Sequence, residues 1–156
     1  MHHSMKSAGE GEAFWRFSLA FYAQPGVAAA LIELQDRSGR DVNAMLYGLW
    51  LAVVRGETMT AAAAAAPPAD AAVELRALRR RLRADPEPDI QALRRRVQAV
   101  EIAAERVAQA RLAASAGQPS KAADRAEAAA ANFALAAGEP PPQAVARAIW
   151  RFTRRA

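Results

Sequence analysis

Polar residues gather at one turn of the sequence, between two strongly apolar segments. Glu33 and Asp36 are three positions apart, which places them about one turn apart on a helix. With their polar neighbours they form a candidate ligand or partner site, made up of Glu33, Gln35, Asp36, Arg40, Asp41 and Asn43. Carboxylate and amide oxygens of this kind can bind Mg²⁺ or a cationic group.

The same turn also has a purely structural interpretation, which we favour. Asp41 can cap the N-terminus of the next helix, and Asp36 can pair with an arginine. Polar residues at turns usually serve local hydrogen bonding. The ligand hypothesis stays open because Gln35, Asp41 and Asn43 lie between apolar helices, where partly buried polar groups need defined partners.

Arginines form the second candidate, a basic patch on two consecutive predicted helices. Its members are Arg76, Arg79, Arg80, Arg81, Arg83, Arg94, Arg95 and Arg96. If the proline-containing break at 85–89 makes the two helices an antiparallel hairpin, the arginines of both helices lie towards the same end of that hairpin. Such a patch would attract nucleic-acid phosphates or an acidic protein. We favour a solvated face, in which the arginine stems cover an apolar stripe.

Several kinds of chemistry are excluded by composition. The 156 residues include no cysteine, so disulfides, thiolate metal sites and cysteine nucleophiles are absent. The two histidines, His2 and His3, stand beside Ser4 and resemble a start-site extension. No phosphate-cradling glycine motif is found. We therefore expect no catalytic residues, no metal ion and no cofactor.

The spacing of apolar residues predicts an all-α fold, a compact helical bundle of about six to seven helices with a long antiparallel hairpin. We expect a flexible N-terminus at 1–9 and one helical domain at 10–156. Within it, 10–55 are aromatic core helices, 70–116 an Arg-rich hairpin and 119–156 C-terminal helices. The predicted helices cover residues 10–23, 26–37, 42–55, an alanine-rich stretch that Thr58 or Thr60 caps and that stops before Pro67, 70–84, 88–116, 121–137 and 143–155.

Two further surfaces are candidates for partners. Apolar spacings of three and four predict a seam that is the partner face of a helical hairpin or of a coiled coil, formed by Ile90, Leu93, Val97, Val100, Ala104, Val107 and Arg111. This seam could join two copies of the chain or bind another protein. The basic, aromatic segment 150–155 could contact an anionic membrane surface or a partner groove. For that segment we favour packing of Ile149, Trp150 and Phe152 onto the bundle.

No segment approaches the roughly 20 apolar residues that a membrane-spanning helix needs. The N-terminus also lacks the pattern of a secretory signal. We therefore expect no transmembrane segment and a cytoplasmic location.

The aromatic part of the chain resembles a known family. The sequence FWRFSLAFY at 14–22 is followed by LQDRSGRDVN at 34–43 and LWLA at 49–52. These strings resemble a family of small proteobacterial proteins catalogued as domain of unknown function 2390. The resemblance covers about a quarter of the chain directly and implies a helical fold. It implies no activity and assigns no functional residues.

These observations favour a non-catalytic helical interaction or regulatory protein, with another protein or a second copy as its partner. One alternative is a nucleic-acid- or ribosome-associated protein that uses the arginine patch. The other is a binder of a small ligand or metal at the turn between Glu33 and Asn43.

Overall fold

Seven α-helices account for most of the residues that the structure describes. The computed structural model describes residues 2–63, 67–115 and 119–154, with side chains from Gly9 onwards. The helices and strands, in order, are α1 His2–Tyr22, α2 Val27–Ser38, α3 Val42–Trp50, the π-helix η1 Leu51–Arg55, β1 Glu57–Thr58, α4 Ala69–Leu82, α5 Pro88–Ala114, β2 Ser120–Lys121, α6 Arg125–Ala137 and α7 Gln143–Thr153. The predicted all-α class is confirmed.

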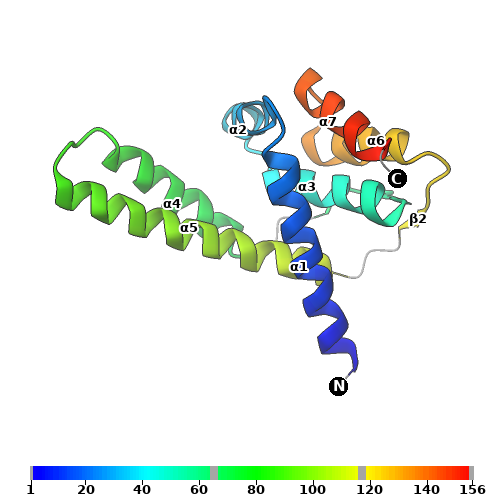
Figure 1. Cartoon of the computed structure of the whole chain (residues 1–156), viewed down its shortest axis with the longest axis horizontal. Coiled ribbons are helices and arrows are strands. Elements are labelled where there is room, and N and C mark those ends of the chain that lie inside the picture. The colour runs from blue at the N-terminus through cyan, green and yellow to red at the C-terminus, as the bar shows by residue number, and fades with distance from the viewer. Residues whose placement is uncertain (1, 64–66, 116–118, 155–156) are drawn as a thin grey trace.

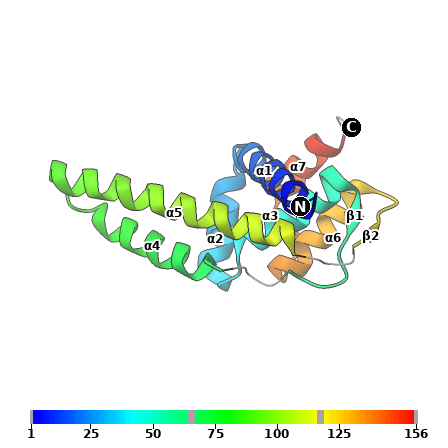
Figure 2. The same ribbon diagram turned by 90° about the horizontal axis from the view of Figure 1, so that it is seen from below.

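The helices divide between a body and a projecting hairpin. Helices α4 and α5 pack along each other in antiparallel directions, and their connecting turn lies far from the rest of the molecule (Figure 1). The body contains α1, α2, α3, α6 and α7, and α1 crosses α5 near the base of the hairpin (Figure 2). The predicted long hairpin is therefore present, and α1 and α3 pack against α5 at its base (Figure 2).

The core lies where the sequence concentrates its large residues. Phe14 packs against Tyr47 and Trp50, with ring centroids 5.6 and 5.4 Å apart. Phe152 of α7 packs against Phe17 and Phe21, with ring centroids 5.7 and 5.3 Å apart. These rings join α1 to α3 and to α7, and they fix the position of α1 relative to the body.

The turn between α2 and α3 forms as predicted. Gly39 ends α2 in the left-handed conformation, with φ of 69°, and its N–H donates to Gln35 O. Asp41 caps α3 by accepting a hydrogen bond of 3.0 Å from Asn43 N.

Asn132 explains why the helices pack closely at Gly48. The Asn132 side chain is fully buried, donates to Gly48 O and Glu57 O, and accepts from Met59 N. A Cβ atom added at Gly48 would lie 3.1 Å from Asn132 Cβ and from its carbonyl oxygen. The lack of a side chain at Gly48 therefore allows α3 and α6 to pack closely.

Three predicted boundaries are wrong. Helix α1 begins at His2 rather than near Glu10, because residues 2–9 contain no proline and a helix extends at little cost once it is nucleated. The predicted alanine helix is absent from residues 57–63, where tertiary hydrogen bonds to Asn132 and β2 override alanine's helix propensity. Residues 64–66 of that prediction lie outside the described part. Helix α6 begins at Arg125 rather than Lys121, since Asp124 caps it.

Three residues of the C-terminal helix were expected to pack onto the bundle, and two of them do so. Ile149 is buried and Phe152 packs on α1, but Trp150 is exposed. Its indole lies under the guanidinium of Arg154, 4.6 Å from the ring centroid. The prediction that Trp150 packs onto the bundle is therefore wrong.

Within the described residues, no single helix combines the length and hydropathy needed to cross a membrane. Among the same residues, one pair of helices, α1 from Gly9 and α2, reaches that length and composition when taken together, and the two are bent by 102° where they meet.

Candidate ligand-binding site

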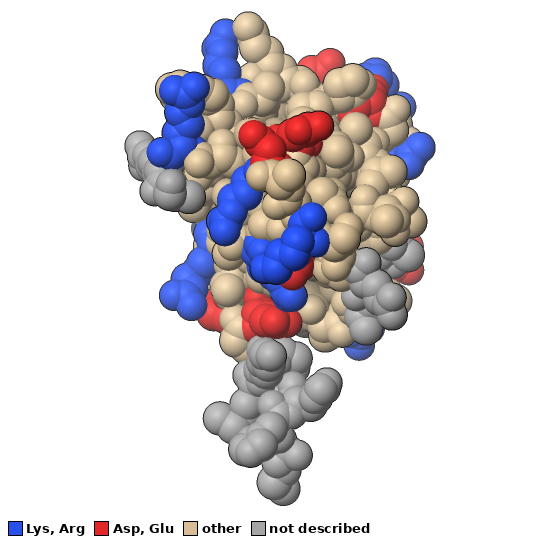
Figure 3. Space-filling view, turned by 90° about the vertical axis from the view of Figure 1, so that its right-hand side faces the viewer, with Lys and Arg blue, Asp and Glu red and all other residues tan. Residues whose placement is uncertain are grey.

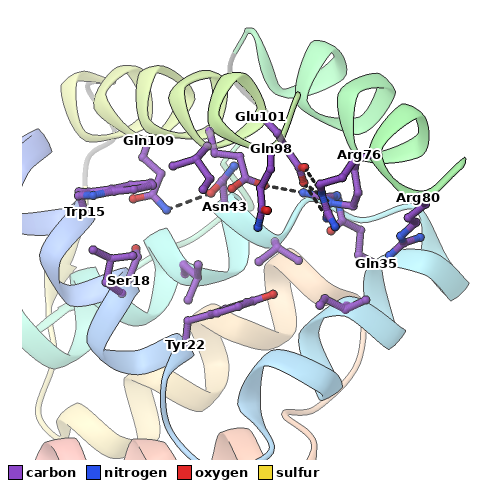
Figure 4. A pocket seen from close by; sticks show the side chains of 17 residues that line it. Trp15, Ser18, Tyr22, Gln35, Asn43, Arg76, Arg80, Gln98, Glu101 and Gln109 are labelled. Atoms are coloured by element: carbon purple, nitrogen blue, oxygen red, sulfur yellow. Dashed lines mark hydrogen bonds and ion pairs between the residues drawn. The ribbon is translucent and has the colours of Figure 1, made fainter. Parts of the chain in front are cut away.

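A pocket of about 300 Å³ lies between the base of the hairpin and the body. We call it the hairpin pocket. Helices α4 and α5 form one wall, and α1, α2 and α3 form the others (Figure 4). Its size is at the lower end of the range for small-molecule sites.

The residues of α1 that line the pocket lie on one side of this helix. Trp15, Ser18, Leu19 and Tyr22 line the pocket, and steps of three and four place such residues on one side of a helix. The neighbouring side of α1 carries Phe14, Phe17 and Phe21 into the core. The aromatic packing that holds α1 in place therefore also turns this polar and apolar strip towards the hairpin.

Two buried amides join the hairpin to the body inside the pocket. Gln109 of α5 donates from Nε2 to Oδ1 of Asn43 on α3, over 3.0 Å (Figure 4). The two residues are only 2% and 8% exposed. This bond uses one donor and one acceptor and leaves the other half of each amide available.

Two buried polar atoms on the pocket wall lack a hydrogen-bond partner among the described residues. They are Ser18 Oγ and Gln109 Oε1, and the Ser18 residue is only 3% exposed. Buried polar groups in proteins are nearly always paired, and an unpaired one costs about 1–3 kcal/mol. Both atoms belong to residues that line the pocket, which makes them candidate hydrogen-bond partners for a molecule held there.

A network of ion pairs closes the hairpin side of the pocket. Glu101 of α5 is buried and accepts from Nε of Arg76 at 3.0 Å and from Nε of Arg79 at 2.6 Å. Arg76 also pairs with Glu105. The network ties α4 to α5 and keeps both guanidinium groups against the pocket wall.

Burial changes the acid–base properties of groups around the pocket. Burial raises the pKa of Glu105 above its ordinary value, although the charge of Arg76 opposes the change. Burial likewise raises the pKa of the Tyr22 phenol and of the Asp41 carboxyl, whose backbone hydrogen bonds act in the opposite direction. Glu105 and Asp41 therefore hold protons more tightly in the folded protein than ordinary carboxyl groups do.

The predicted polar turn is divided between several roles. Asn43 and Gln35 line the hairpin pocket, while Asp41 caps α3. Asp36 is exposed and pairs with Arg80 of α4 through two contacts of 3.2 Å. Glu33 and Arg40 are exposed, and the Arg40 guanidinium lies against Gly138. Among the described residues, no three acidic or histidine side chains lie close enough to hold a metal ion together.

The predicted arginine patch is also divided. Arg76, Arg79 and Arg80 pair with carboxylates, and Arg94 donates to Gln91. The exposed remainder, towards the hairpin turn, is Arg81, Arg83, Arg95 and Arg96. On the opposite end of the molecule, basic and acidic side chains are interspersed on a mostly uncharged surface (Figure 3).

The predicted seam on α5 is not one buried face. Val97 is buried, but Leu93, Val100 and Val107 are 46%, 54% and 47% exposed. The buried face of α5 instead runs through Val97, Glu101, Ala108 and Leu112, because α5 packs on α4 and the body on the same side. Three of the other seam positions form an exposed apolar stripe, Leu93, Val100 and Val107, which we call the outer stripe.

The sequence reading missed most of the hairpin pocket. Ser18, Gln98, Glu101 and Gln109 were not singled out, although two of them carried a signal. Glu101 and Gln109 lie eight positions apart on the buried side of α5, where apolar residues are the rule. Polar residues at buried helix positions are the pattern that would have marked the pocket.

Comparison with known proteins gives a family and no closer relative. No curated protein and no solved structure matches the chain. Residues 13–112, which include every residue that lines the hairpin pocket, match a family described as "Protein of unknown function (DUF2390)". Because the match covers well over half of the chain, the protein belongs to this family.

Proposed function

We propose that the protein is a non-catalytic ligand-binding protein, in which a small organic molecule occupies the hairpin pocket. The observation that carries this proposal is the pair of buried, unpartnered atoms, Ser18 Oγ and Gln109 Oε1, on the wall of one pocket in the described structure. A ligand that pairs with both atoms removes the cost of leaving them without partners.

The pocket's position gives ligand binding a regulatory consequence. One wall belongs to the hairpin and the others to the body, so a bound molecule contacts both. A ligand that contacts both parts stabilises the arrangement in which they lie together. Occupancy of the pocket would therefore control the position of the hairpin and of the outer stripe that it carries.

A fragment screen tests the proposal. Saturation-transfer NMR on the full chain would detect weak binders, and each hit would be repeated on Ile102→Trp. Ile102 lines the pocket and is 44% exposed, so a larger side chain there blocks the pocket without entering the core. Val107→Trp is the matched control, because Val107 is on the same helix, 47% exposed and outside the pocket lining.

The proposal expects several hits that bind the wild type and Val107→Trp equally well and lose binding in Ile102→Trp. It is overturned if no fragment binds, or if every hit binds Ile102→Trp as well as it binds the wild type.

The outer stripe supports a second candidate function, binding of a helical partner or a second copy. Leu93, Val100 and Val107 are spaced by seven residues and form one exposed apolar line on α5. Light scattering of the wild type and Val100→Glu tests it for self-association. A wild-type mass above that of the monomer, reduced by Val100→Glu, supports it, and equal monomeric masses remove self-association.

Nucleic-acid binding has less support. Three of the eight predicted patch arginines already pair with carboxylates, which reduces the charge available for phosphates.

A further inference from the structure

The amide pair in the hairpin pocket offers a donor and an acceptor together. In the Asn43–Gln109 bond, Gln109 uses Nε2 and Asn43 uses Oδ1. Gln109 Oε1, an acceptor, remains without a partner, and Asn43 Nδ2 makes no hydrogen bond within the described residues. Ser18 Oγ, which can donate or accept, lines the same pocket. A ligand that satisfies this wall needs an N–H or O–H donor beside an acceptor.

The charges around the pocket are already balanced. Each of the lining guanidinium groups, Arg76, Arg79 and Arg80, pairs with a carboxylate of Glu101, Glu105 or Asp36. A charged ligand would lose hydration on entering and find no unmatched opposite charge among these groups. The pocket therefore favours a neutral molecule over a phosphate, a carboxylate or an amine.

The remaining walls are apolar. The mostly apolar side chains that line the pocket include Trp15 and Leu19 of α1, Leu46 of α3 and Ile102 of α5. A volume of about 300 Å³ suits a molecule of one or two rings rather than a nucleotide or a lipid.

We infer that the hairpin pocket binds a neutral, mostly apolar molecule through a lactam or carboxamide edge. The N–H of that edge donates to Gln109 Oε1, and its carbonyl oxygen accepts from Asn43 Nδ2 or Ser18 Oγ. This inference rests on the proposed function, because it specifies the ligand of the same pocket.

A matched pair of probes tests the inference on the unaltered chain. The first is 2-quinolone, a neutral two-ring lactam, and the second is N-methyl-2-quinolone, which lacks only the N–H donor. Quinoline-2-carboxylate serves as the anionic comparison. Dissociation constants would be measured by titration calorimetry or by NMR shifts. We expect N-methylation to weaken binding at least about tenfold, the effect of one lost hydrogen bond of about 1.4 kcal/mol. The carboxylate should bind more weakly than 2-quinolone.

Two variants assign the hydrogen bonds to atoms. Gln109→Met keeps the size of the side chain and removes the acceptor, so 2-quinolone and N-methyl-2-quinolone should then bind with nearly equal affinity. Ser18→Ala removes only the hydroxyl. The affinities of both probes should therefore fall by the same factor or stay unchanged, and the ratio of their two dissociation constants should be kept. Gln143→Met is the matched control, since Gln143 is exposed on α7 outside this pocket.

The possible failures can be told apart. The inference is wrong if N-methylation leaves the affinity of the wild type unchanged, or if the carboxylate binds better than the lactam. It is also wrong if neither lactam binds while other fragments occupy the pocket, and in that case the proposed function stands. If no fragment of any kind binds in the pocket, both fail.

Discussion

Gln109 of α5 donates a hydrogen bond to Asn43 of α3 across 3.0 Å, and both side chains are buried. The bond is a polar link between the hairpin and the body, and both of its residues line the hairpin pocket (Figure 4). Asn43 follows the cap residue Asp41 by two positions, so the turn between α2 and α3 sets where its amide lies. The local structure of one turn therefore positions one member of this amide pair.

Replacing one member of this pair should destabilise the fold. Asn43→Ala leaves the buried Gln109 amide with no partner among its present neighbours, and we expect a loss of about 1–3 kcal/mol in unfolding free energy. Urea denaturation followed by circular dichroism would measure it. Gln98→Ala is the control, because Gln98 also lines the pocket but is exposed. Equal stability of the two variants would contradict a structural role for the pair.

Gly48 should not tolerate even a methyl group. In Gly48→Ala the new Cβ would meet Asn132 at 3.1 Å, against backbone and a side chain that makes three hydrogen bonds. We expect a destabilisation of about 1–3 kcal/mol from overpacking.

Gly9→Ala is the control for Gly48→Ala, because nothing lies within 4 Å of the position where the Cβ atom of Gly9→Ala would be placed. Alanine is the better helix former, so the melting temperature of Gly9→Ala should stay level or rise. A loss of stability in Gly9→Ala as large as that in Gly48→Ala would contradict this packing.

The buried ion pairs of the hairpin should matter far more than the exposed one. Glu101→Gln removes a buried carboxylate and leaves Arg76 and Arg79 with reduced compensation, which we expect to cost about 3–5 kcal/mol. Asp36→Asn removes an exposed partner of Arg80, and its cost should be about 0–1 kcal/mol. Chemical denaturation of both variants gives the comparison. Similar costs would show that Glu101 is not shielded from solvent as the structure has it.

Glu105 and Glu139 should change the pH dependence of stability in opposite directions. Burial raises the pKa of Glu105 above its ordinary 4.5, so the folded state binds this proton more tightly than the unfolded state. The stability that Glu105 contributes is therefore lost as the pH rises above about 4.5. A hydrogen bond from Arg37 lowers the pKa of Glu139, whose contribution is present above 4.5 and is lost as the pH falls.

Unfolding free energies of the wild type, Glu105→Gln and Glu139→Gln between pH 3 and pH 8 would separate these effects. Relative to Glu105→Gln, the wild type should lose stability as the pH rises through the window that opens at 4.5. Relative to Glu139→Gln, the wild type should gain stability as the pH rises through the range just below 4.5. Differences of the same sign for both variants would contradict the assigned environments.

Much of the fold follows from local sequence signals. Gly39 and Asp41 mark the turn between α2 and α3, and the prolines at 86 and 88 mark the hairpin turn. The aromatic spacing of Phe14, Phe17 and Phe21 identifies the buried side of α1. These signals depend on residues close in the sequence, so they can be read without the tertiary structure.

The hairpin pocket could not be predicted in the same way, because its walls come from five helices. Ser18 and Gln109 are ninety-one positions apart, and only tertiary packing brings them to one pocket. The extent of the outer stripe could not be predicted for a related reason: spacings of three and four identify an apolar face but do not say which of its residues the fold buries. The alanine-rich segment after Thr58 was misassigned because Asn132 lies seventy-three positions beyond its partner Met59.

The side-chain amide signals of Asn43, Gln109 and Asn132 test the central claim most directly. Their ¹⁵N–¹H resonances would be followed while the full chain is titrated with 2-quinolone. Asn132 is fully buried, is already paired and lies outside the hairpin pocket, so its amide is an internal control. We predict saturable shifts for Asn43 and Gln109 and an unchanged Asn132 signal. A titration that leaves Asn43 and Gln109 unmoved, or shifts Asn132 as much, would contradict binding in the hairpin pocket.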